Sequence, residues 1–98
     1  MLDDDEDRAL RVNGIDIDFI AQRVADLLEI PEEVVWQEGK SQHLVRARSL
    51  LCFWAVRRLG EIMTSLARRL NISTVAVSKS VTRGAEIAGR EGLKLVES

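Results

Sequence analysis

The sequence predicts an all-α fold: a compact domain of about five helices, with a long central helix and a helix-turn-helix. Three observations support this prediction. Apolar residues recur three and four positions apart in successive segments, which places them on one face of a helix. No segment alternates apolar and polar residues as a strand does. The chain has 98 residues, 46% of them hydrophobic, which suffices for one domain with a modest core.

Residues 1–14 are predicted to form an acidic, disordered leader ahead of a helical domain over residues 15–95. Five of the first seven residues are acidic, and the stretch offers little to bury. Two interpretations stay open: a solvated tail, or a segment that competes with DNA phosphates for a basic surface. Asp16 or Asp18 can cap the first helix of the domain. Its apolar face is formed by Ile17, Ile20, Val24, Leu27 and Leu28.

The middle of the chain predicts a short helix followed by the central one. The run Ile30-Pro31-Glu32-Glu33 is a helix start, since proline is tolerated in the first turn and acids favour the positive end of the helix dipole. We expect this helix over about 31–36, ended by Gly39. The longest pattern then runs from Ser41 to Gly60 and is apolar over more than half of its circumference. Such a helix should be the most buried one.

The stretch from Met63 to Gly84 predicts a helix-turn-helix. Leu66 and Leu70 share a face of the first helix, Asn71 tolerates the left-handed conformation that ends it, and Ser73 can cap the second helix from about Thr74. Val77, Val81 and Gly84 then point inward, and the second helix continues to about residue 90. Gly84 would allow close packing. An ordinary helical hairpin is the alternative interpretation.

The side chains on the outward face of the second helix are short, polar or basic, which suits a DNA major groove. Small side chains allow close approach, hydroxyls and ammonium groups can bond to bases, and methyl groups can meet thymine. The candidate base-facing residues are Thr74, Val75, Ala76, Ser78, Lys79, Thr82 and Arg83. The candidate phosphate contacts are Lys40, Arg46, Arg48, Thr64, Ser65 and Ser73. For Arg46 and Arg48, a solvated helix face is an equal alternative.

The charge distribution agrees with duplex DNA as the partner. Residues 1–39 hold three arginines against twelve acids, whereas residues 40–98 hold eleven Lys and Arg against four acids. The basic part contains the helix-turn-helix, as expected of a nucleic-acid module with an acidic flank. The net charge of −2 hides this split.

Catalysis, cofactors and metals are not expected. Cys52 is the only cysteine and lies among apolar neighbours, and His43 is the only histidine and stands at a helix start. No glycine loop of the phosphate-cradling kind is present. No apolar run approaches about 18 residues and no apolar leader opens the chain, so we expect no membrane association and a cytoplasmic, nucleoid-associated protein.

Two strings, ARSLLCFWAVRRLG and SLARRLNISTVAVSKSVTRGAEIA, resemble the C-terminal accessory domain of REP-associated tyrosine transposases, relatives of the HUH transposases. That domain is similar to the DNA-binding helical domain of the bacterial chromosomal replication initiator. The resemblance covers roughly residues 15–95. It implies a basic loop at Gly39-Lys40-Ser41, phosphate contacts from Lys40, Arg46 and Arg48, and bases facing residues 73–79.

The chain departs from both families. The initiator signature Asp-His-(Ser/Thr)-Thr-Val is replaced by the residues at 73–77, Ser-Thr-Val-Ala-Val, so recognition of the origin box is not implied. The transposases cut DNA with a tyrosine and a pair of metal-binding histidines, and this chain has no tyrosine and one histidine. These residues therefore cannot cleave DNA by that route.

Three settings for the domain remain open. It could be tethered to a parent catalytic domain, or it could be a free-standing homodimeric transcriptional regulator. A third alternative is a protein-interaction module that uses Trp36 or Phe53 and binds no DNA. Trp36 and Trp54 also fit the core, since Trp54 lies on the apolar side of the central helix.

Overall fold

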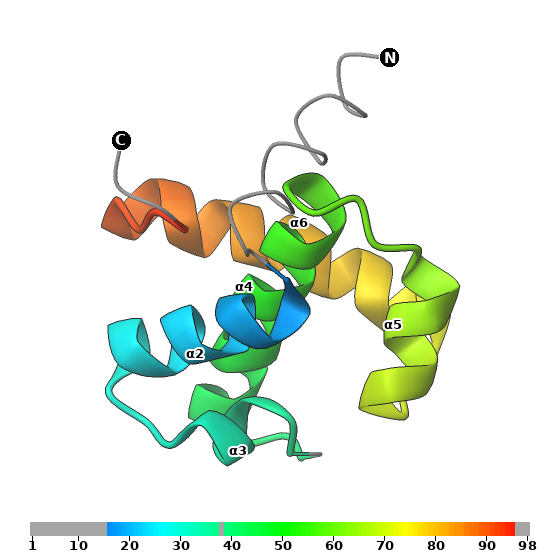
Figure 1. Ribbon diagram of the computed structural model, residues 1–98, viewed down its shortest axis with the longest axis horizontal. Coiled ribbons are helices and arrows are strands. Elements are labelled where there is room, and N and C mark those ends of the chain that lie inside the picture. The colour runs from blue at the N-terminus through cyan, green and yellow to red at the C-terminus, as the bar shows by residue number, and fades with distance from the viewer. Residues whose placement is uncertain (1–15, 38, 96–98) are drawn as a thin grey trace.

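The computed structural model describes residues 16–37 and 39–95, which form five helices and contain no strand (Figure 1). The predicted all-α class is confirmed. The molecule measures 36 × 27 × 23 Å along its principal axes. The predicted acidic leader, residues 1–14, lies outside the described residues. Within the described part, no helix is both long enough and apolar enough to cross a bilayer.

Helix α2 spans Ile17–Leu28 and begins as the sequence predicts. Of the two candidate caps, Asp16 is the one that acts: its Oδ1 accepts from the backbone N–H of Phe19 at 2.9 Å. The helix ends at Glu29, which adopts the left-handed conformation with φ 58°. Its buried face packs on the central helix.

Helix α3, Glu32–Val35, is shorter than the predicted 31–36. Pro31 lies before the first turn instead of in it, because its ψ of 147° is extended. It still starts the helix, since its carbonyl oxygen accepts from the N–H of Val34 at 3.0 Å. Trp36 caps the other end and is half-buried against the core.

Helix α4, Gln42–Arg57, is the central helix, as predicted, and contacts α2, α3 and α6. Leu50, Leu51 and Cys52 are fully buried, and Trp54 is only 3% exposed, so Trp54 belongs to the core. The helix ends at Arg57, three residues before the predicted stop. Gly60, with φ 77°, lies in the turn that follows. At 16 residues α4 is shorter than α6, which has 18.

The predicted pair of helices is present as α5, Met63–Leu70, and α6, Thr74–Glu91, joined by three residues. Asn71 ends α5 in the left-handed conformation with φ 57°. Ser73 caps α6, its Oγ accepting from the N–H of Ala76 at 3.0 Å. Both interactions follow the prediction. Figure 1 shows α6 passing across α4, with α5 packed beside its first turns.

Close packing of α4 and α6 sets the position of the second helix. Gly84 faces α4 so closely that an added Cβ would collide with the carbonyl oxygen of Ser49 and lie 2.6 Å from the Cβ of Phe53. Val77 and Val81 are buried beside it, as predicted, and Ser80 is buried as well. The small residues at this crossing hold α6 against the core and leave its opposite face in solvent.

Arg69 connects α5 to the N-terminal helices. Its Nη2 donates to Oδ1 of Asp18 on α2 at 3.0 Å, and its guanidinium carbon lies 4.5 Å from the ring centre of Trp36. An arginine over an indole face is attracted by the negative ring face. Asp18 of α2 and Trp36, just after α3, therefore contact the first helix of the pair through this one side chain.

Candidate nucleic-acid interface

The solvent face of α6 contains nearly all of the predicted base-facing residues. Thr74, Val75, Ser78 and Lys79 are exposed along its first turns, and Thr82 and Arg83 follow on the same helix. Ala76 is half-buried and lies at the margin of this face. Val75 is 62% exposed, an unusual placement for a large apolar side chain. We call residues 74, 75, 78, 79, 82 and 83 the α6 outer face.

Of the hydroxyl groups on or beside the α6 outer face, two already form a hydrogen bond within the protein. The Oγ of Ser73 accepts the capping bond, but a hydroxyl keeps its own proton for donation to a phosphate. Thr82 Oγ1 donates to the carbonyl oxygen of Ser78 at 3.4 Å, which turns its hydroxyl toward the helix. Ser78 is exposed. These hydroxyls can therefore donate or accept at short range.

The first turn of α5 contains two predicted phosphate contacts, Thr64 and Ser65, both exposed. Ile62, at the N-cap position, offers no side-chain acceptor, so no side chain satisfies the N–H groups of this turn. Such N–H groups favour an anion. The two hydroxyls therefore lie at this turn beside Ile62, whose apolar side chain is 66% exposed.

The three basic residues around the start of α4 have different surroundings. Lys40 is exposed on the loop that precedes the helix. Arg46 forms a bidentate ion pair with Glu91 of α6, with nitrogen-to-oxygen distances of 2.5 and 2.7 Å. Arg48 donates through Nη2 to the carbonyl oxygen of Gly39 at 3.2 Å. The structure therefore gives Arg46 and Arg48 intramolecular partners that the sequence did not reveal.

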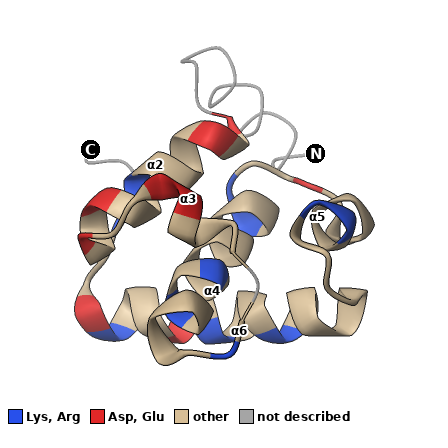
Figure 2. Ribbon diagram, turned by 90° about the horizontal axis from the view of Figure 1, so that it is seen from below, with Lys and Arg blue, Asp and Glu red and all other residues tan. Residues whose placement is uncertain are grey.

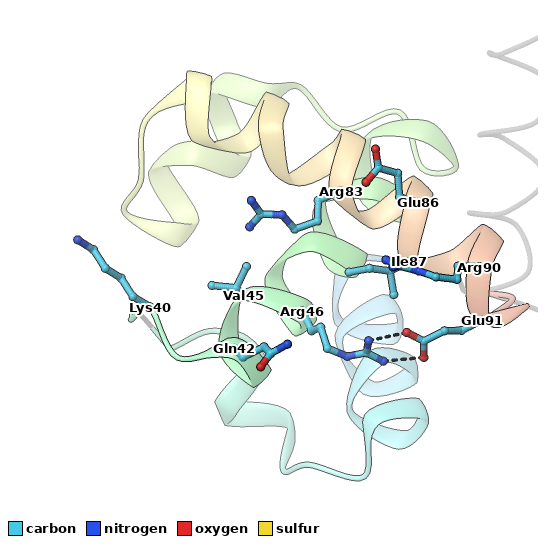
Figure 3. Close-up of a pocket in the computed structure, with 9 residues that line it drawn as sticks. All are labelled: Lys40, Gln42, Val45, Arg46, Arg83, Glu86, Ile87, Arg90 and Glu91. Atoms are coloured by element: carbon cyan, nitrogen blue, oxygen red, sulfur yellow. Dashed lines mark hydrogen bonds and ion pairs between the residues drawn. The ribbon is translucent and has the colours of Figure 1, made fainter.

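Three of the candidate residues line one hollow between α4 and α6 (Figure 3). Its volume is about 650 Å³. Lys40, Gln42, Val45 and Arg46 come from the start of α4 and the loop before it; α6 contributes Arg83, Glu86, Ile87, Arg90 and Glu91. In Figure 3 the Arg83 guanidinium points toward the side on which Lys40 lies, and the Arg46–Glu91 pair closes the other end.

Arg90 is a member of this hollow that was not predicted from the sequence. It lies seven residues after Arg83, two helical turns along the same face. That spacing is visible in the sequence, but the predicted DNA-facing residues end at Arg83, although the helix is expected to continue to about residue 90. The partner of Arg46 had no sequence signal, because Glu91 is 45 residues away.

Acidic and basic residues occupy different parts of the molecule. Residues 16–37 hold six acids and one arginine, whereas residues 39–95 hold eleven Lys and Arg and three acids. Figure 2 shows acids gathered over α2 and α3 and basic residues over α4, α5 and α6. Glu61, Glu86 and Glu91 are the acids of the basic part. The α6 outer face therefore belongs to the part of the molecule in which basic residues outnumber acids.

Cys52 and His43 are the two side chains that were considered for catalysis, and they lie in different surroundings. Cys52 is fully buried, and this burial raises the pKa of its thiol to about 12, so the thiol stays protonated near neutral pH. His43 is exposed at the start of α4. Among the described residues, no side chain or backbone group forms a hydrogen bond with its imidazole.

Comparisons with protein-family models, with curated protein sequences and with solved structures find no match to this chain.

Proposed function

We propose that this chain binds duplex DNA without catalysing a reaction on it, and that α6 enters the major groove. The observation that carries the proposal is the α6 outer face. It lies on a capped helix of 18 residues, and its exposed side chains are mostly polar or basic. A major groove admits one helix, and the turn before α6 keeps its N-terminal end uncovered. The positive charge around it supports the same partner.

Phosphate contacts supply most of the affinity in this proposal. Lys40 and the first turn of α5, with Thr64 and Ser65, flank α6 and would hold the backbone, assisted by the cap residue Ser73. With about four to six neutralised phosphates, the slope of log affinity against log salt is about −4 to −5. Arg48 supports this surface indirectly, since it holds the carbonyl of Gly39 beside Lys40.

Base contacts supply sequence preference. Lys79 can donate to the O6 and N7 acceptors of guanine, and the Val75 methyl groups can pack on a thymine methyl. Ser78 and Thr74 can bond to several base edges and so contribute less discrimination. Arg83 lies two turns from the start of α6 and would reach a base or the strand beside the groove.

A tethered accessory domain is the setting we favour, because the resemblance to the accessory domains of REP-associated tyrosine transposases covers the helices that carry this surface. A nucleoid association would follow. A module that binds only proteins is less well supported: Trp36 is half-buried under Arg69, and Phe53 is half-buried beside α6. Trp36 is thus partly covered, whereas Phe53 borders an open depression that Ala85, Ala88 and Leu93 also line.

Fluorescence anisotropy with a random-sequence duplex, measured across a salt series, tests the proposal. We expect binding that weakens steeply as salt rises, with the slope given above. A flat and weak response would contradict duplex binding and favour a protein partner.

A further inference from the structure

The hollow between α4 and α6 is continuous with the α6 outer face. A shallow depression lined by Ser78, Lys79, Thr82, Arg83 and Glu86 covers the middle of α6. Two of these residues, Arg83 and Glu86, also line the larger hollow. The hollow and the α6 outer face therefore meet at these two residues.

Four cationic side chains line the hollow: Lys40, Arg46, Arg83 and Arg90. Among the described residues, Lys40 and Arg83 form no ion pair, and Arg46 is the only one of the four with a bidentate partner. Two acids share the hollow, Glu86 and Glu91. The cations are in excess, so the hollow favours an anion.

In the Arg46–Glu91 pair, the Glu91 carboxylate accepts from the Arg46 guanidinium in the way that a bound phosphate would. A guanidinium donates two parallel N–H bonds to a carboxylate or to a phosphate with the same fork. Glu91 supplies both acceptor oxygens, at 2.5 and 2.7 Å. Both side chains remain about one-third exposed, so water and another anion can reach the pair. An exposed pair of this kind is held weakly and can be exchanged.

We propose that the hollow is a second phosphate site on the duplex, and that Glu91 occupies Arg46 as a stand-in until a backbone phosphate replaces it. This inference rests on the proposed duplex binding. Arg83 and Arg90 on α6 line the same hollow, and Lys40 lies at the end opposite the Arg46–Glu91 pair, where it could contact a neighbouring phosphate (Figure 3).

A double-mutant cycle tests the exchange. Duplex affinity is measured for the wild type, Glu91→Gln, Arg46→Ala and the double variant, with circular dichroism to show that each is folded. We expect Glu91→Gln to tighten binding by about two- to fivefold, because Arg46 no longer has to leave a carboxylate. In the Arg46→Ala background the same change should gain much less.

Glu86→Gln is the matched control, since Glu86 lines the same hollow and has no ion pair with the described residues. Its effect should be the same with and without Arg46. If Glu91→Gln also gains equally in both backgrounds, its carboxylate acts only as a nearby negative charge, and the exchange is overturned while duplex binding stands. If the wild type binds no duplex at all, both proposals fall.

A second arm distinguishes the source of the phosphate. Amide spectra of the wild type are recorded with a short duplex and, separately, with inorganic pyrophosphate. We expect the duplex to shift the resonances of both Gln42 and Lys79, whereas pyrophosphate shifts them only weakly. A saturating response of Gln42 to pyrophosphate, with duplex affinity unchanged by Arg46→Ala, would assign the hollow to a small phosphate ligand and overturn the duplex assignment.

Discussion

Gly84 of α6 lies directly against the carbonyl oxygen of Ser49 in α4, and this contact sets how closely the two helices cross. Because glycine has no side chain, α6 packs closely on α4 at position 84, and the opposite face of α6 stays in solvent. The proposed DNA-binding surface therefore depends on a glycine that would not touch DNA.

Gly84→Ala should destabilise the domain by more than about 2 kcal/mol, because the new methyl group must displace backbone atoms of α4. Thermal unfolding followed by circular dichroism measures the change. Gly89→Ala is the control: it lies in the same helix with nothing within 4 Å of its added Cβ, and it should stabilise by about 0.5–1 kcal/mol. Equal effects at the two positions would contradict the close crossing.

Ser73→Ala should lower the free energy of unfolding by about 1 kcal/mol, since it removes the acceptor for the N–H of Ala76. Ser78→Ala, in the exposed middle of the same helix, should change stability by less than about 0.5 kcal/mol. Urea unfolding of the two variants gives the comparison. A loss at Ser78 as large as that at Ser73 would argue against the cap.

The pKa of the Glu91 carboxyl should lie below its ordinary value of 4.5, chiefly because Arg46 donates hydrogen bonds to its charged form. The pair therefore stabilises the fold above the ordinary pKa, and this contribution is lost as pH falls through the lowered one. Carbon-detected NMR titration of Glu91 measures the shift. In Arg46→Ala the pKa should return toward 4.5, and an unchanged value would refute the pair.

Lys79→Ala should reduce both the affinity for duplex DNA and the preference among sequences, because it removes a base contact from the α6 outer face. Lys40→Ala should weaken all duplexes by a similar factor and make the salt slope less steep by about 1, since it removes a phosphate contact. Anisotropy competition with several duplexes separates the two. Losses that ignore sequence in both variants would refute the assignment of the recognition face.

Local patterns predicted the helix pair because each signal acts within a few residues. Asn71 and Ser73 form the turn and the cap with neighbours one to four positions away, so their roles follow from residue type and spacing. Gly84 was predicted to pack closely because its place on the wheel is inward. The apolar periodicity of residues 44–59 likewise predicted the central helix, although its last turn ends earlier.

The pairs that join distant helices could not be predicted. Glu91 lies 45 residues after Arg46 in the sequence, so no helical spacing indicates that the two side chains form an ion pair. Arg69 meets Asp18 and Trp36 because its long side chain reaches from α5 to the N-terminal helices. These contacts depend on the crossing of helices, which residue spacing alone does not determine. The hollow between α4 and α6 could not be predicted for the same reason, because residues of both helices line it.

Selection of bound duplexes from a random pool tests the central claim most directly. The wild-type chain should recover one short motif that Lys79→Ala fails to enrich: a single half-site for a tethered domain, or a palindrome for a dimer. Recovery of sequences without any shared motif, under salt conditions in which the chain binds, would contradict sequence-specific recognition by α6.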